Sequence, residues 1–342
     1  MDTMKVYCEV GFLRNLFESI DSPFSDKGEV VMQIIKFLSK ATIIFDVSKD
    51  SVITSFINNP IFKFIFKSSQ KGINPGRHKW LNENFCDISQ SSQPNMLAIY
   101  LTTLPEIECN RRMKKFGVMV FNCETILKAE HLFIDCGISL PNTDKIKKGW
   151  ESILGHKYVN VCNSLVIIDN YILQSNDKQT WGNKSVNEKI KNNLIPILDC
   201  LLPKELSGTE PFHLYIFAYE SNNSFKTLMK VDNESGIPMQ IKQLRGGKVP
   251  IKMVLISCKK EFHDRIILTN NLMISSGLGF DLFKEGDYIV KKPTSVSIIF
   301  PFIQSFNSWA ERHYMEILDS ALKAEKTINK YGDDFKHRLL YG

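Results

Sequence analysis

The stretch at residues 259–283 reads KKEFHDRIILTNNLMISSGLGFDLF and holds the residues on which the fold assignment depends. Two mostly apolar runs, at 265–269 and 272–275, predict short strands of one sheet. A basic segment with a histidine precedes the first run, and a glycine-containing segment follows the second. His263, Arg265, Asn270 and Gly277 therefore stand at fixed spacings around two predicted strands.

The chain around this stretch predicts an α/β domain at residues 158–304, because apolar runs alternate with segments of helical spacing. Further strands are predicted at residues 165–168, 212–219, 251–257 and 295–300. Helices are predicted at residues 186–202 and 224–231. The first of these strands ends in Asp169, which could contact a ligand or cap the turn that follows. We expect the cap, because aspartate commonly bonds to the backbone two residues on.

The spacing of the polar residues resembles the signature of the phospholipase D superfamily, H-x-K-x4-D-x6-G-S-x-N. His263 matches the nucleophile of that family, Arg265 stands at the lysine position and Asn270 at the aspartate position. Gly277 follows at the family's spacing. The resemblance implies a phospholipase-D-like α/β module with a single motif.

The chemistry of that family predicts which functions these side chains retain. There the imidazole attacks a phosphodiester, a cation stabilises the developing oxygen charge and a carboxylate orients the imidazole. Arg265 could bind phosphate bidentately, whereas Asn270 has no charge, and Leu278 and Phe280 replace the family's serine and asparagine. The family also brings two motifs together. Phosphate recognition is therefore our first hypothesis, and a metal-independent phosphodiesterase or nuclease, active as a homodimer through His263, is the alternative.

The element order around I-I-D-N-Y-I, at 167–172, is also similar to the single-motif module at the C-terminus of some MIT-domain proteins. That module generally acts as a binding device, and related modules occur in prokaryotic mobile-element and defence neighbourhoods. The resemblance implies a subunit of such a system that binds nucleic acid or a protein complex. An abundance of Lys, Asn and Ile, typical of an AT-rich genome, favours a bacterial or mobile-element source. A purely structural role for His263, with its ring bonded to the backbone, is the simpler alternative.

Basic residues gather just before the motif and could follow a phosphate backbone. They are Lys242, Arg245, Lys248, Lys252, Lys259 and Lys260. A solvated hairpin is the alternative interpretation of this segment.

The first part of the chain predicts a second α/β domain, at residues 1–140, with a parallel sheet. Strands are predicted at residues 5–10, 41–47, 96–101 and 117–122. Helices are predicted at residues 11–20, 29–39 and 106–116, and a helix broken near Pro60 at residues 51–66.

The segments MKVYCEVGFL, at 4–13, and AIYLTTLPEIECNRRMKKFGVMVFNCETIL, at 98–127, resemble the strands that open and close PIN-like nuclease domains. In that family an aspartate ends the first strand and binds a divalent cation, and here Glu9 takes its place. Asp46 and Glu106 are the further candidates, because Mg²⁺ prefers several converging oxygen ligands. No cofactor is expected unless this domain binds a cation. The alternative is a PIN-like domain used for contact or scaffolding.

Composition sets the remaining limits. The 342 residues favour two domains, and 43% hydrophobic residues suffice for two cores. A net charge of +6 permits a phosphate-bearing partner. No apolar run is long enough for a membrane span and the N-terminus does not resemble a secretion signal, so we expect a cytoplasmic protein. The eight scattered cysteines predict buried thiols. Residues 141–157 predict a partly helical connector, and residues 305–342 a C-terminal helix that packs on the body or a partner. A third hypothesis is a structural scaffold subunit that docks through this helix.

Overall fold

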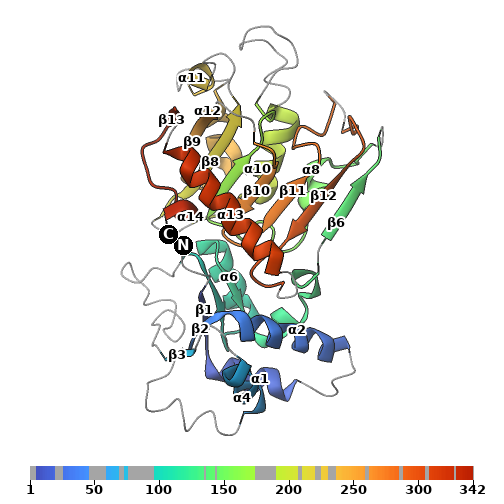
Figure 1. Cartoon of the computed structure of the whole chain (residues 1–342), viewed down its shortest axis with the longest axis vertical. Coiled ribbons are helices and arrows are strands. Elements are labelled where there is room, and N and C mark those ends of the chain that lie inside the picture. The colour runs from blue at the N-terminus through green and yellow to red at the C-terminus, as the bar shows by residue number, and fades with distance from the viewer. Residues whose placement is uncertain are drawn as a thin grey trace. The chain divides into compact units, whose positions relative to one another are not determined.

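A computed structural model of the chain divides into two compact units (Figure 1). The first unit comprises Met1–Asp135 with Ile299–Arg312, and the second comprises Cys136–Ile298 with His313–Gly342. The structure describes residues 5–19, 26–45, 59–68, 73–75, 96–134, 136–142, 145–173, 190–206, 210–219, 225–229, 236–258, 262–284, 288–304, 308–326 and 329–341. The predicted mixed α/β fold class is confirmed, with a parallel sheet in one unit and a larger mixed sheet in the other.

The first unit has a five-stranded sheet in the order β3-β2-β1-β4-β5, and the neighbouring strands pair in parallel. The strands are β1 (Lys5–Cys8), β2 (Thr42–Phe45), β3 (Ile73–Pro75), β4 (Ala98–Leu101) and β5 (Met119–Phe121). The helices are α1 (Val10–Glu18), α2 (Asp26–Lys40), α4 (Pro60–Ser68), α6 (Glu106–Phe116), α7 (Cys123–Leu127) and the 3-10 helix η1 (Glu130–Leu132). The parallel sheet predicted from the sequence is confirmed.

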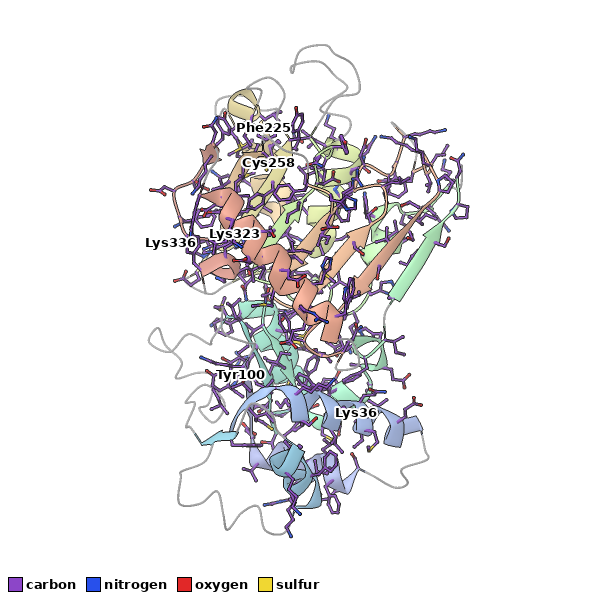
Figure 2. All side chains as sticks on the ribbon, in the orientation of Figure 1. Lys36, Tyr100, Phe225, Cys258, Lys323 and Lys336 are labelled. Carbon is purple, nitrogen blue, oxygen red and sulfur yellow. The ribbon has the colours of Figure 1, made fainter. Side chains whose placement is uncertain are left out.

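The strands at the centre of this unit are mostly apolar because both faces of the sheet are covered. Every residue of β4 and β5 is buried. Tyr100, labelled in Figure 2, stacks on Tyr7 of the neighbouring strand with ring centroids 5.1 Å apart. The helix α6 ends where Gly117 adopts a left-handed conformation with φ of 61°, which glycine adopts without a steric cost. Pro60 begins α4, where proline suits the first turn of a helix. Residues 51–58 of the predicted broken helix lie outside the described ranges.

The second unit has an eight-stranded sheet in the order β13-β9-β8-β7-β10-β11-β12-β6. The strands are β6 (Cys136–Leu140), β7 (Ser164–Ile168), β8 (Phe212–Tyr219), β9 (Ile251–Cys258), β10 (Ile266–Thr269), β11 (Met273–Ser276), β12 (Thr294–Ile299) and β13 (Lys330–Gly332). The strands β7, β8 and β9 run parallel, whereas β10 runs antiparallel to β7 and β11 antiparallel to β10. The outer strands β6 and β13 also pair antiparallel with their neighbours.

Helices cover this sheet and fix its ends. They are α8 (Trp150–Leu154), the π-helix η2 (Ile190–Leu194), α10 (Ile195–Leu201), α11 (Phe225–Leu228), α12 (Ile237–Gln243), the 3-10 turn η3 (Leu244–Gly247), α13 (Ser308–Glu325) and α14 (Arg338–Tyr341). Figure 1 shows α13 crossing in front of the strands, and the Tyr314 hydroxyl donates a hydrogen bond to the carbonyl of Thr269 there. Phe225, labelled in Figure 2, packs edge-on against Tyr331 of β13 at 6.3 Å.

Three predicted boundaries differ from the structure. Residues 136–140, assigned to the first domain, form β6 and pair with β12 of the second sheet. The residues of β6 alternate between half-buried and exposed, so no continuous apolar run marked the strand. The connector at 141–157 contains α8, whose Trp150 is fully buried in the second unit. The C-terminal segment forms α13 and also adds β13 to the sheet beside β9.

The chemical environment of the cysteines agrees with the sequence. Five described cysteines are buried and two are half-buried, and all seven are free thiols. Burial raises the pKa of Cys109 and Cys258 to about 12, so these thiols stay protonated near neutral pH. Among the described residues, no helix combines the length and apolar character that crossing a bilayer requires.

Candidate functional site

The candidate site lies at the edge of the second sheet where the parallel strands end. Ile168, the last residue of β7, pairs with Ile266, the first residue of β10. Because these two strands run antiparallel, the segment after Ile168 and the segment before Ile266 leave the sheet side by side. Asp169, His263 and Arg265 therefore reach one edge, which we call the β7–β10 edge.

Asn170 fixes the segment that carries the histidine. Its side-chain amide donates to the carbonyl of Phe262 at 2.7 Å, and its side-chain oxygen accepts from the Phe262 N–H at 3.0 Å. These two hydrogen bonds continue the pairing of the backbone in the segment that precedes β10, and they hold the backbone next to His263 in place.

Asp169 is fully buried and accepts two backbone hydrogen bonds. Its Oδ1 accepts from the Tyr171 N–H at 2.8 Å, so the predicted turn cap is confirmed. Its Oδ2 accepts from the Phe280 N–H at 2.6 Å, a contact that was not predicted from the sequence. Burial raises the pKa of the Asp169 carboxyl, while the two N–H groups and Arg265 oppose that shift.

Gly279 is the glycine that this edge requires. It has φ of +90°, and a Cβ atom there would lie 2.8 Å from Oδ2 of Asp169 and 3.0 Å from Cδ of Arg265. The Ser276 hydroxyl donates to the Gly279 carbonyl at 2.5 Å and closes the turn. Gly277, the glycine singled out by the motif, is exposed, and a Cβ there would approach nothing closer than 3.5 Å.

Arg265 is half-buried and held by packing. The Cζ atom of its guanidinium lies 5.5 Å from the centroid of the Tyr171 ring, which gives a cation–π contact. Its Nε is buried, and within the described residues the guanidinium donates no hydrogen bond and forms no ion pair. The protein therefore positions a cation at this edge without using its donors.

His263 is exposed to solvent over its whole side chain. Among the described residues its ring has one polar neighbour, with Nδ1 3.5 Å from Oδ1 of Asp264. The ring makes no bond to the described backbone, so the simpler alternative of a structural histidine does not describe it. The Asp264 carboxylate is also about half-exposed, so the pair is solvated.

Asn270, which stands at the aspartate position of the predicted motif, does not join this site. It follows β10 at the opposite end, and its Oδ1 accepts from the Asn163 N–H at 2.9 Å. Five residues of extended strand separate it from Arg265, which corresponds to roughly 16 Å. Its role is to satisfy a buried backbone donor.

The basic residues predicted to bind phosphate also do not gather near His263 in the part of the chain that the structure describes. Lys242 and Lys248 are exposed on α12 and just after η3, and both precede β9. The eight residues of β9 span roughly 26 Å, so these lysines lie at the far edge of the sheet from His263. Lys259 and Lys260 lie outside the described residues. The predicted single phosphate-binding surface is therefore not assembled by the described residues.

Arg245 bonds within the protein and does not extend towards a phosphate backbone. Its guanidinium bonds to the carbonyls of Asp199 and Leu202 at the end of α10, and its Nη1 lies 3.3 Å from Oδ1 of Asp199. The hairpin alternative is also wrong, because α12 and η3 occupy this segment.

Two of the three predicted metal ligands of the first unit, Glu9 and Glu106, bond to other residues of the protein. The buried Glu9 carboxylate accepts from the Thr102 hydroxyl at 2.9 Å and from the N–H and hydroxyl of Thr103 at 2.6 and 2.5 Å. Its oxygens therefore tie the end of β1 to the end of β4. Glu106 instead pairs with Lys128 at 3.7 Å, and Asp46 lies outside the described residues. Nowhere in the described ranges do three such ligands cluster as a cation would need.

A second polar network, not predicted from the sequence, holds the turn after Gly279. Asp281 accepts from the Asn193 side-chain amide at 2.9 Å and pairs with Lys291 at 2.7 Å. Asn193 lies in the π-helix η2 and also accepts from the Trp150 indole N–H at 3.3 Å. These side-chain hydrogen bonds connect the turn to α8 and η2.

Comparison with known proteins does not assign the chain to a family. No protein-family model and no curated protein sequence matches the chain. The function must therefore be argued from the β7–β10 edge itself. That edge offers an exposed imidazole, a fixed guanidinium with unused donors and a buried carboxylate behind them.

Proposed function

We propose that the chain is a nucleic-acid-binding subunit whose second unit, a phospholipase-D-like module, recognises phosphate at the β7–β10 edge. The setting that we propose is a prokaryotic defence or mobile-element system in the cytoplasm, as the resemblance to single-motif modules implies. The first unit would then be a PIN-like domain that serves for contact with a protein partner.

The unused donors of Arg265 carry this proposal. A half-buried guanidinium normally meets an acceptor within the protein, and here the described residues provide none. Tyr171 and Gly279 hold its position before any ligand arrives. A phosphate oxygen would supply the missing acceptor through a charge-assisted hydrogen bond.

The surroundings of His263 favour binding over cleavage. A nucleophilic histidine needs a group that orients its ring and supports its charged form. The ring is fully exposed, Asp264 is its one polar neighbour among the described residues, and Asn270 is used elsewhere. An exposed imidazole beside a fixed guanidinium is suited to contact a phosphate backbone without breaking it.

The hydrogen bonds of Glu9 favour a structural role over metal binding in the first unit. A carboxylate that accepts three hydrogen bonds between two strand ends stabilises the sheet and has little capacity left for a cation. We therefore propose scaffolding for this unit and no metal-dependent hydrolysis.

Binding of short DNA and RNA strands to the full chain tests the proposal. The Arg265→Gln variant removes the guanidinium and should weaken binding about tenfold, the value of one charge-assisted hydrogen bond. Lys242→Ala also removes one positive charge but lies at the far edge of the sheet, and it should bind as the natural sequence does. Equal affinities for the Arg265→Gln and Lys242→Ala variants would refute the site.

A cleavage assay separates the hydrolytic alternative. Cleavage that persists in EDTA and disappears in a His263→Ala variant would establish a phosphodiesterase and overturn binding as the function. Cleavage that requires a divalent cation and Glu9 would instead restore the PIN-type mechanism.

A further inference from the structure

A cavity of about 670 Å³ opens in the second unit, away from the β7–β10 edge. Its walls come from α8 and the segment after it, from α10, from η3 and from Tyr288. These segments precede β7, β8 and β9 in the chain, so the cavity lies near the opposite ends of the parallel strands. Its volume falls within the range typical of small-molecule sites.

The charges in this cavity leave a positive excess. The cations that line it are Lys148, Lys157, Lys204 and Arg245, and the acids are Glu151 and Asp199. Lys148 lies 3.0 Å from Glu151, and Arg245 lies 3.3 Å from Asp199. Both acids are thereby engaged, and Lys204 has no ion pair with any residue that the structure describes. Lys204 is therefore available to attract an anion.

Backbone strain is concentrated around the same cavity. Tyr158 has φ of 73° and Arg245 has φ of 55°, and they are the two non-glycine residues with positive φ in the described ranges. Both line the cavity. Such conformations are unfavourable for residues with a Cβ atom and recur at ligand-binding positions. Strain at two separate segments that meet at one cavity indicates a site built for a ligand.

Tyr288 gives the cavity a fixed aromatic wall. Its side chain remains 37% exposed, although its ring packs edge-on against Phe283 at 5.6 Å. Gly149, with φ of +53°, lets this ring lie against the backbone, because a Cβ atom there would be 2.3 Å from Tyr288 Cδ1. An exposed ring that the protein holds in place can stack on a planar group.

We propose that this cavity binds a small phosphorylated ligand with a planar ring, of the mononucleotide class. Lys204 contacts the phosphate, and Tyr288 stacks on the ring. The Cys200 thiol in the cavity wall stays protonated near neutral pH, because burial raises its pKa to about 11.

Calorimetric titration of the full chain with adenosine monophosphate tests this site, with inorganic phosphate and adenosine as partial probes. Adenosine monophosphate should bind at least about tenfold more tightly than either partial probe, since only it offers both groups. Lys204→Ala and Tyr288→Ala should each weaken its binding about tenfold. Both side chains are near the surface, and circular dichroism checks that the variants fold. Lys242→Ala, outside the cavity, is the matched control and should bind unchanged.

Three results would overturn the proposal. They are an absence of saturable binding, an affinity for inorganic phosphate equal to that for adenosine monophosphate, and equal affinities in Lys204→Ala and Lys242→Ala. Because the cavity and the β7–β10 edge share no residue, each can fail without the other.

Discussion

Acidification should destabilise the second unit through two buried histidines, His213 and His337. The ring Nε2 of His337 lies 3.1 Å from the carbonyl oxygens of both Leu165 and His213. His213 Nδ1 accepts from the Arg338 N–H at 3.2 Å, which requires an unprotonated nitrogen. Burial, with the positive charge of Arg338 nearby, lowers the pKa of each histidine to about 3.

The sign and size of the effect follow from this difference in pKa. Each histidine has a pKa of 6.5 when unfolded and about 3 when folded, so the unfolded chain binds more protons in between. Stability is therefore complete above pH 6.5 and falls as the pH decreases towards 3. Each histidine loses about 1.4 kcal/mol per pH unit, or about 2 kcal/mol down to about pH 5, and the pair about 4 kcal/mol.

Urea unfolding at about pH 7.5 and about pH 5, followed by circular dichroism, measures this loss. A His337→Gln variant, whose amide cannot be protonated, should lose only about half as much free energy of unfolding between the two pH values. His263→Gln is the control, because that ring is already in solvent. A free energy of unfolding that is equal at both pH values would refute the assignment of neutral, buried histidines.

Three further predictions concern single contacts. Gly279→Ala should cost about 2 kcal/mol or more of unfolding free energy, because it combines a positive φ with a clash against Asp169, whereas Gly277→Ala should cost less; urea unfolding compares them. Glu9→Gln should lower the free energy of unfolding by about 1–3 kcal/mol, since the amide nitrogen cannot accept the threonine hydrogen bonds. If EDTA changed the melting temperature of the protein, the structural role of Glu9 without a metal would be contradicted. Asn270→Ala should cost about 1–3 kcal/mol by leaving the Asn163 N–H unsatisfied, with unchanged nucleic-acid affinity in a binding titration.

The sequence predicted elements well where one physical signal dominates. The strand at 212–219 is β8 with the predicted bounds, because its apolar run is buried almost throughout. The helix at 106–116 is α6, which has acidic residues in its first turn, basic residues in its last and a glycine at its end. The strand β6 was missed because its exposure alternates and its partner, β12, lies far along the chain.

The candidate site was predicted only in part, because linear spacing does not determine which edge of a sheet a residue reaches. His263 and Arg265 share an edge since both precede β10, while Asn270 follows that strand and lies at the other end. Asp169 and Gly279 meet because β10 pairs with both β7 and β11, and no motif encodes these pairings. The local sequence signal that could have marked Gly279 is a glycine between two large apolar residues, which is typical of a tight turn.

The salt dependence of nucleic-acid binding tests the central claim most directly. If Arg265 contacts a phosphate, Arg265→Gln should reduce the slope of log affinity against log salt by about 0.7 to 0.9, the share of one phosphate contact. The affinity at low salt should fall in the same variant, and Lys242→Ala should retain both values. A slope and an affinity unchanged by Arg265→Gln would contradict phosphate recognition at the β7–β10 edge.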